Sequence, residues 1–354
     1  MSAFIHAVSH ARPQNVFTQE ACLAALRQHG LYSRLNNKSH RLLNRVMCSS
    51  SGIHQRFLAL DAIADGFVTD PDTLHRRFEH HAPLLATAAA QRALQKAGRD
   101  PSGIDAVLVS TCTGYLCPGL STYVSEQLGL RPDAILLDLV GQGCAAAIPN
   151  LQTAHALIEA SQANSVLSVC VEVCSAAFYL DDDPGVIISA CLFGDAAGAM
   201  LLEKAPPSQG RHVRWIQSYS HLEPDKRELL RFTHRRGMLR NILSAETPQL
   251  AASSSELLLK KALKDLSLRK DDISAWVTHA GGKRVIESLQ TTLQLKSTDL
   301  AVSRNLLRDY GNTSSSFVML ALERHLEDTS LGGHWWMHSF GAGFSSHGLM
   351  LHVD

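Results

Sequence analysis

The chain has 354 residues, of which 45% are hydrophobic and 19% charged, the balance of a globular protein with a large core. Lysine and arginine balance aspartate and glutamate at 33 each, so the net charge gives no indication of a nucleic-acid or anionic-membrane partner. The N-terminal stretch lacks an uninterrupted apolar core, and no apolar segment is long enough to cross a bilayer. We therefore expect a cytoplasmic protein.

The 8 cysteines are too sparse for a disulfide scaffold, and none forms a C-x-x-C pair. A structural zinc site is therefore not expected. Most of these cysteines are expected to be small buried hydrophobic residues, as free cysteines usually are.

Short apolar strands alternate with longer helical patterns, which is typical of an α/β fold. In the first half, the patterns predict helices over 86–98 and 145–161 and strands over 104–111, 134–140 and 165–173. In the second half, they predict helices near 250–266, 283–293 and 314–326 and strands over 273–279, 334–340 and 347–353.

Two of these strands, IDAVLVST at 104–111 and ISAWVTH at 273–279, are similar, and each follows a helix. This similarity suggests two related halves. Proline, glycine and polar residues cluster over 205–212, so we predict an N-terminal half at 1–205 and a C-terminal half at 206–354.

Cys144 lies in LDLVGQGCAAAIPNL, where a strand ends, Gly141 and Gly143 permit a sharp turn, and a helix begins at or just after the cysteine. Unpaired amides and the helix dipole favour negative charge there, so a thiol ionises more easily. The same amides can stabilise an oxyanion on a bound thioester. Taken alone, a buried cysteine in a tight turn explains this segment equally well.

Two other polar residues follow predicted strands or precede helices. His279 ends an apolar strand and is followed by Gly281 and Gly282, and Asn312 precedes a helical pattern in DYGNTSSSF. Open α/β sheets collect ligands at the carboxyl ends of their strands. A Cys–His pair supplies an activated nucleophile, and an added amide donor suits a reaction that develops an enolate. A structural role for His279 stays open, because the chain has 18 histidines.

Seven segments, taken in order, resemble the type III polyketide synthases, relatives of chalcone synthase with the thiolase fold. They are STCTGYLCPGL at 110–120, VGQGCAAA at 140–147, CVEVCSAAFYLDDD at 170–183, CLFGDAAGA at 191–199, THAGG at 278–282, YGNTSS at 310–315 and SFGAG at 339–343. The resemblance implies a five-layer αβαβα fold of two pseudo-repeated halves. It also implies a catalytic triad of Cys144 in the first half with His279 and Asn312 in the second.

The same resemblance implies the residues of the substrate pocket. Phe193 matches the family's gatekeeper phenylalanine, whereas the second gatekeeper falls in GMLRNIL, which offers Leu239 or Arg240 and no aromatic residue. The remaining cavity-lining positions are occupied by Cys112, Thr113, Cys174, Ala177 and Ser314. Cys117 stands where the family has a methionine that crosses a dimer interface, so a homodimer is expected.

Coenzyme A phosphates need cations. The candidates are Lys38, Arg41 and Arg45 in the region where the family binds CoA, and Gly281, Gly282, Lys283 and Arg304 beside the His279 and Asn312 loops. For each cation, an exposed solvated charge is the alternative.

The resemblance implies iterative decarboxylative condensation of malonyl-CoA onto an acyl-CoA starter, with no cofactor, no metal and no nucleic-acid partner. An acyl carrier protein is an alternative starter donor. The chain is most similar to bacterial alkylresorcinol and alkylpyrone synthases, which implies a long-chain fatty acyl starter and a final cyclisation. The alternatives are a short or aromatic starter, a single condensation like that of β-ketoacyl synthase III, a metal-binding module and a catalytically inactive scaffold.

Overall fold

The computed structural model describes residues 3–48 and 51–354, which build a nine-stranded sheet with the order β11-β12-β13-β8-β1-β7-β6-β4-β5. Its strands are β1 (Phe4–Ala11), β4 (Ala106–Ser110), β5 (Ile135–Leu139), β6 (Ser165–Glu172), β7 (Ala196–Glu203), β8 (Val213–Leu222), β11 (Ile273–Thr278), β12 (Gly333–Gly341) and β13 (Ser345–Val353). Most of these strands are buried on both faces, which explains why they read as continuous apolar runs in the sequence.

The sheet contains the same arrangement twice. In β1-β7-β6-β4 the neighbouring pairs are antiparallel, antiparallel and parallel, and β8-β13-β12-β11 repeats that pattern. The two sets meet where β1 and β8 pair, at Phe4 with Arg214 and Ile5 with Val213. The predicted α/β fold of two pseudo-repeated halves is therefore confirmed.

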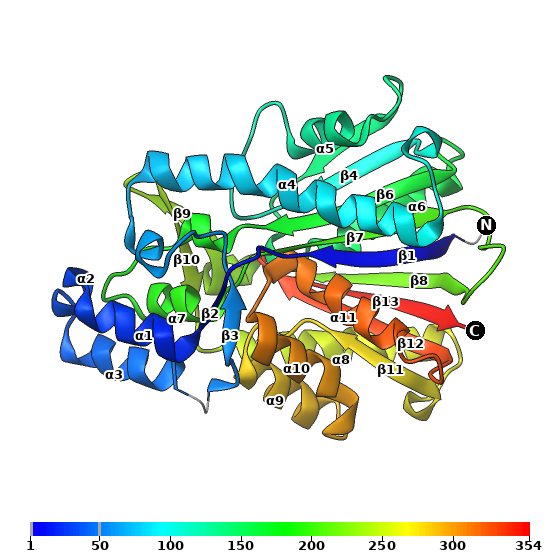
Figure 1. Ribbon diagram of the computed structural model, residues 1–354. Coiled ribbons are helices and arrows are strands. Elements are labelled where there is room, and N and C mark those ends of the chain that lie inside the picture. The colour runs from blue at the N-terminus through cyan, green and yellow to red at the C-terminus, as the bar shows by residue number, and fades with distance from the viewer. Residues whose placement is uncertain (1–2, 49–50) are drawn as a thin grey trace.

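Helices form the other layers (Figure 1). α6 (Ala147–Glu159) and α11 (Phe317–Leu326) each contact strands of both halves. α4 (Pro71–Ala97) and α5 (Leu120–Leu128) pack on the first half, and α8 (Thr247–Asp265), α9 (Lys283–Thr292) and α10 (Ala301–Tyr310) belong to the second. α11 is buried on nearly all sides, as its run FVMLAL requires.

Smaller elements gather at one end of the sheet, on the left in Figure 1. They are α1 (Gln19–Gln28), α2 (Gly30–Ser33), α3 (Asn37–Val46), α7 (Pro184–Leu192), the pair β2 (Val16–Thr18) and β3 (Gln55–Phe57), and the hairpin of β9 (Leu230–Arg235) and β10 (Met238–Leu243). Every strand and helix predicted from the sequence forms, and most bounds are shifted by a few residues. The exception is the helix predicted over 86–98, which is the last part of α4, a helix that begins already at Pro71. None of the described helices is long and apolar enough to cross a membrane.

Candidate active site

A cavity of about 400 Å³ collects residues from both halves at this end of the sheet. Cys144, His279 and Asn312 all line it, although they lie far apart in the sequence. Cys144 follows β5, His279 follows β11, and Asn312 lies between α10 and α11. The structure therefore brings together the three residues that the sequence analysis selected.

Cys144 lies in a single 3-10 turn, Gly143–Ala145, just before α6 begins at Ala147. Gly143 has φ +55°, and a Cβ on it would lie 3.1 Å from the backbone nitrogen of Ala342. The glycine thus allows both the turn and the close approach of the β12–β13 connection. The Ser314 hydroxyl donates a hydrogen bond to the Cys144 sulfur at 3.2 Å.

His279 is 1% exposed and is enclosed by Phe317 and Phe340, whose ring centroids lie 5.4 and 5.0 Å from its own. Its backbone N–H donates to the His338 carbonyl oxygen at 2.9 Å. Burial lowers the pKa of His279 to about 3, so the imidazole is neutral at pH 7. Neither ring nitrogen has a partner among the described residues, so the expected Cys–His pair shares a cavity without a direct hydrogen bond.

The side chain of Asn312 is held in one orientation. Its Oδ1 accepts a hydrogen bond from the Ser314 backbone N–H at 2.8 Å, and its Nδ2 donates to the Gly281 carbonyl oxygen at 3.2 Å. An amide nitrogen carries two hydrogens, so one donor is left for a ligand in the cavity.

Burial also governs Cys144. It raises the pKa of the Cys144 thiol to about 12, although the hydrogen bond from Ser314 acts in the opposite direction. The resting side chain is therefore a thiol at pH 7. A thiolate has to be stabilised when the sulfur reacts.

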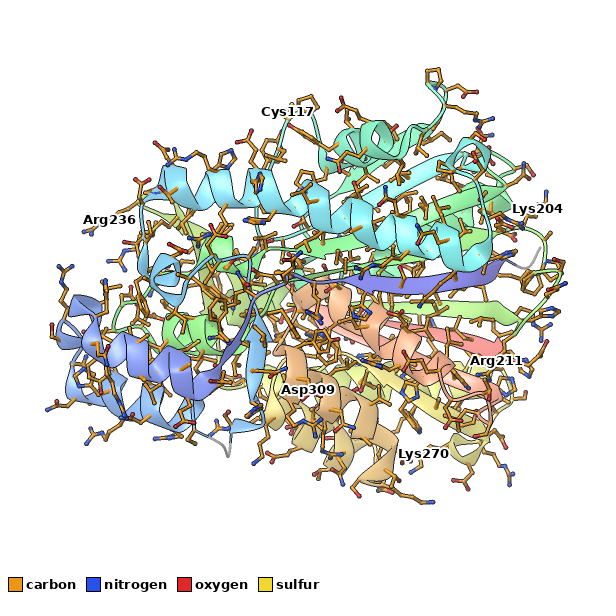
Figure 2. The ribbon with its side chains drawn as sticks, viewed as in Figure 1. Cys117, Lys204, Arg211, Arg236, Lys270 and Asp309 are labelled. Carbon is orange, nitrogen blue, oxygen red and sulfur yellow. The ribbon has the colours of Figure 1, made fainter. Side chains whose placement is uncertain are left out.

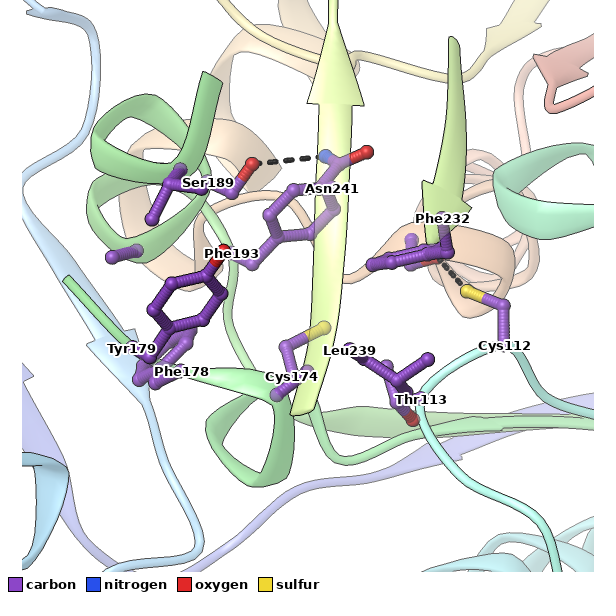
Figure 3. Close-up of a pocket in the computed structure, with 14 residues that line it drawn as sticks. Cys112, Thr113, Cys174, Phe178, Tyr179, Ser189, Phe193, Phe232, Leu239 and Asn241 are labelled. Atoms are coloured by element: carbon purple, nitrogen blue, oxygen red, sulfur yellow. Dashed lines mark hydrogen bonds between the residues drawn. The ribbon is translucent and has the colours of Figure 1, made fainter. Parts of the chain in front are cut away.

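A smaller cavity of about 30 Å³ adjoins the large one, and Figure 3 shows Phe193 and Phe232 among the residues that line it. Phe193, the predicted gatekeeper, and Phe232 of β9 line both cavities. The GMLRNIL segment itself has no aromatic residue, as the sequence analysis noted, but Phe232 of the neighbouring strand was not considered there. Phe232 pairs with Asn241 across the β9–β10 hairpin, which places an aromatic ring next to the GMLRNIL segment.

The smaller cavity, called the gate cavity below, is lined by most of the predicted pocket residues. Its lining includes Cys112, Thr113, Cys174, Ala177, Phe193, Leu239 and Ser314. Arg240 is not among them, because its guanidinium forms an ion pair with Asp183. Cys117 is exposed on the loop before α5 and does not line the cavity (Figure 2).

The predicted CoA-binding residues separate into two groups. Arg45, Gly281, Gly282 and Lys283 line the large cavity, and so do Arg231 and Arg284, which the sequence analysis did not select. Lys38 and Arg41 are exposed on α3 outside the lining. Arg304 lines a separate groove, and its guanidinium donates to the Ser297 carbonyl oxygen and to Gln290.

Glu172 was missed by the sequence analysis. It is fully buried at the end of β6 and accepts hydrogen bonds from Ser314 Oγ at 3.2 Å, from the Cys112 backbone N–H at 3.1 Å and from Ser315. Burial raises the pKa of Glu172. The available signal was a carboxylate inside the otherwise apolar strand CVEVC.

Comparison with known families identifies the chain. Residues 1–206 match the model of the N-terminal domain of chalcone and stilbene synthases, and residues 222–353 match that of the C-terminal domain. The chain belongs to the chalcone and stilbene synthase family. It is a type III polyketide synthase, an acyltransferase that uses CoA thioesters including malonyl-CoA.

Relatives and solved structures agree with this assignment. The chain is 30% identical over 291 residues to a 3,5-dihydroxyphenylacetyl-CoA synthase of Amycolatopsis balhimycina, covering 80% of this chain and 77% of that one. A second synthase of that name, from Streptomyces toyocaensis, is 28% identical over 293 residues, covering 80% and 75%.

Among solved structures, PKS-I of the brown alga Ectocarpus siliculosus has a TM-score of 0.91 and 25% identity, covering 100% of this chain and 98% of that one. The 1,3,6,8-tetrahydroxynaphthalene synthase of Streptomyces coelicolor A3(2) has a TM-score of 0.89 and 23% identity, covering 99% of each chain, and supports the fold. The predicted thiolase-like fold and the membership of the polyketide branch are confirmed.

Proposed function

We propose that Cys144 is the nucleophile that carries the growing acyl chain, and that His279 and Asn312 stabilise the enolate that extends it. The cavity shared by these three residues is the observation that supports this proposal best. In the loading step, the Cys144 sulfur attacks the thioester carbonyl of an acyl-CoA, the bond to the CoA sulfur breaks, and CoA leaves with the proton that the cysteine loses.

Extension then uses malonyl-CoA. Its carboxylate leaves as carbon dioxide, and the electron pair of the broken C–C bond forms an enolate. A neutral His279 and the remaining Nδ2 donor of Asn312 hydrogen-bond the enolate oxygen. The enolate attacks the acyl carbonyl on Cys144, the C–S bond breaks, and the lengthened β-ketoacyl-CoA reloads the cysteine for the next round.

We propose that Arg45 and Lys283 bind the CoA phosphates, because both line the large cavity on α3 and α9. Lys38 and Arg41 lie on the same helix as Arg45 and extend this basic surface. Arg304 is excluded from the proposed site, because its guanidinium is engaged elsewhere. An acyl carrier protein as an alternative donor and the cytoplasmic location stay predictions.

We propose a long-chain fatty acyl starter that is extended and cyclised to an alkylresorcinol or alkylpyrone. A second apolar cavity of about 70 Å³ shares Phe178, Tyr179 and Ala190 with the gate cavity. Its other walls are largely aliphatic and aromatic side chains, such as Leu26 and Phe67. A tail that passes Phe193 would reach this second cavity when the shared side chains turn.

A short starter is the second candidate, because the gate cavity is small. A volume of 30 Å³ holds about two water molecules, so it accepts a small acyl group without rearrangement whereas a long tail requires side-chain movement. The similarity to 3,5-dihydroxyphenylacetyl-CoA synthases points the same way, since their product carries no alkyl tail.

One experiment separates the two starters. Products from malonyl-CoA with acyl-CoA chains of different lengths are identified by mass spectrometry in the wild-type enzyme and in Ala190→Phe, which fills the wall shared by the two cavities. The long-chain proposal predicts preferred turnover of long chains that Ala190→Phe abolishes, while short chains are still extended and report an intact site. Preferred turnover of short chains in the wild-type enzyme contradicts it.

We propose that the enzyme works as a homodimer through the face that contains β5, the last strand of the sheet. Val140 and Tyr115 near this edge are 59% and 70% exposed, and Cys117 lies on the same loop as Tyr115. Such apolar surface is typical of an interface. A dimeric mass in solution that Val140→Asp reduces to the monomeric mass supports this arrangement, and a monomeric wild-type enzyme contradicts it.

We also propose that the boundary between the halves lies at residues 205 and 206, with the nucleophile in 1–205 and the histidine and asparagine in 206–354. Limited proteolysis that first cleaves the connection between β7 and β8 supports it.

A further inference from the structure

The wall shared by the gate cavity and the second apolar cavity carries a hydroxyl group without a partner. Phe178, Tyr179 and Ala190 form this shared wall, since all three line both cavities. Figure 3 shows Tyr179 beside Phe178 among the residues that line the gate cavity. The Tyr179 hydroxyl oxygen is buried and forms no hydrogen bond with any described residue.

The other hydroxyl and amide side chains in the described lining of the gate cavity all have partners. They are Thr113 with the Val173 N–H, Ser189 with the Gly185 carbonyl oxygen, Asn241 with the Ser189 hydroxyl, and Ser314 with Cys144. Among these described residues, Tyr179 therefore carries the hydroxyl that is left for a ligand.

A second unpaired donor belongs to the same wall. Arg56 lines the second cavity and is 2% exposed. Its Nη1 donates to the Ala190 carbonyl oxygen at 2.7 Å, and its guanidinium lies over the Phe178 ring, 5.6 Å from the centroid. Its Nε has no partner among the described residues. The shared wall thus offers two donors and lacks an acceptor for either.

A buried donor without an acceptor is costly, and native proteins keep few of them. Burial raises the pKa of Tyr179, and Asp181 acts in the same direction, so the hydroxyl is protonated at pH 7 and can donate. A ligand in the cavities has to supply the acceptor. A hydrocarbon tail has none, whereas a poly-β-keto chain carries a ketone oxygen on every second carbon.

We propose that the Tyr179 hydroxyl donates a hydrogen bond to a ketone oxygen of the growing polyketide and thereby keeps the chain on the enzyme for further extension. The inference rests on the proposed role of Cys144 in carrying that chain. Cys144 lines the large cavity and Tyr179 lines the gate cavity beside it. A chain that lengthens at the cysteine therefore moves its first ketone toward Tyr179. No covalent bond changes at Tyr179.

The size of the effect follows from the strength of one neutral hydrogen bond, which changes the balance between extension and release by roughly fivefold. We expect Tyr179→Phe, which removes only the oxygen, to lower the ratio of the main wild-type product to products with fewer extensions by about fivefold. Its melting temperature should equal or exceed that of the wild-type enzyme, because the removed hydroxyl has no partner within the described protein.

The test identifies, by mass spectrometry, the products formed from malonyl-CoA alone, with hexanoyl-CoA and with palmitoyl-CoA. Tyr219→Phe is the matched control. The Tyr219 hydroxyl is also buried and unpaired among the described residues, but Tyr219 lies beside Trp336 and lines neither the large cavity, the gate cavity nor the second cavity. We expect the wild-type product ratio in this control.

An unchanged product ratio in folded Tyr179→Phe overturns the proposal, because the hydroxyl would then serve only bound water. The same shift in Tyr219→Phe also overturns it. So does a lower melting temperature of Tyr179→Phe, since the hydroxyl would then have a partner within the protein. The proposed function fails separately, when Cys144→Ala still forms the wild-type products. An unchanged ratio together with an inactive Cys144→Ala removes only the role of Tyr179.

Discussion

The backbone of Phe193, whose side chain lines both cavities, pairs with the backbone of Asn312 in an isolated parallel bridge. The Asn312 N–H donates to the Leu192 carbonyl oxygen at 2.8 Å, and the Gly194 N–H donates to the Asn312 carbonyl oxygen at 3.0 Å. The gate and the proposed enolate donor are therefore fixed to each other, although they come from different halves of the chain. A change at this bridge should affect chain entry and catalysis together.

Gly311 makes the bridge possible. Its φ of +72° and ψ of −164° are accessible essentially to glycine alone, and a Cβ there would lie 2.6 Å from the Leu192 carbonyl oxygen. We expect Gly311→Ala to cost about 1–3 kcal/mol of unfolding free energy and to lower condensation activity at least tenfold, because Asn312 is displaced. Thermal unfolding and product formation measure the two effects.

Gly98→Ala is the control for this substitution. Gly98 also has a positive φ, +61°, but no atom lies within 4 Å of the position that a Cβ would take, and it ends α4 away from the cavity. It should lose roughly 1–2 kcal/mol of stability with unchanged activity per folded molecule. Equal activity losses in the two variants would show that Gly311 has no special relation to the site.

Arg56 hydrogen-bonds the backbone on the Phe193 side of the same bridge. This guanidinium is 2% exposed, and its Nη1 donates to the carbonyl oxygens of Ala190 at 2.7 Å and Phe193 at 2.9 Å. Arg56→Met leaves both partly buried carbonyl oxygens unpaired, at about 1 kcal/mol each, and loosens the backbone at Phe193. We expect a lower melting temperature and a broader range of product lengths. Arg92→Met, at an exposed arginine, should change neither, and an unaltered product range in folded Arg56→Met would contradict the role in the gate.

Acid should destabilise the fold through buried histidines. Burial lowers the pKa of His347 to about 4 and that of His338 to about 3, whereas an unfolded histidine titrates near 6.5. As the pH falls below 6.5, these histidines become protonated in the unfolded chain but stay neutral in the folded chain. The stability from each histidine is therefore complete above pH 6.5 and is lost toward pH 4, by about 1.4 kcal/mol per pH unit.

Buried carboxyl groups act in the opposite direction. Burial raises the pKa values of Glu172 and Asp195, so the folded chain binds protons there and offsets part of the loss. The effect of one histidine is isolated by His347→Gln, which should reduce the slope of unfolding free energy against pH between 6.5 and 4 by about one proton. Denaturant unfolding at several pH values measures it, and identical slopes in the two proteins would show that His347 titrates normally.

The sequence was enough to select the residues that line the large cavity, but not to predict which other side chains they contact. Cys144, His279 and Asn312 were found because each borders a strand or helix whose apolar pattern is clear, and strand ends gather at one edge of a sheet. Phe232 was missed because its role depends on pairing across the β9–β10 hairpin. The available signal was the Arg236–Gly237 turn, where both residues have positive φ, between two alternating runs.

Contacts that depend on the direction of a side chain could not be predicted from the sequence either. Nothing in the GMLRNIL segment indicates that Leu239 faces the gate cavity while Arg240 pairs with Asp183. In the same way, the left-handed backbone of Ser314 appears only in the folded chain, because the Asn312 side chain enforces it. The small volume of the gate cavity depends on the packing of several elements and not on any one motif.

The measurement that tests the central claim most directly is mass spectrometry of the enzyme after reaction with acyl-CoA and malonyl-CoA. We predict an acyl or polyketide adduct on Cys144, cyclised polyketide in solution, and neither in Cys144→Ala. Cys170→Ala, which changes a buried cysteine of β6 outside the cavity, should keep both. Polyketide formed by Cys144→Ala, or an adduct on another residue of the wild-type enzyme, would contradict the account.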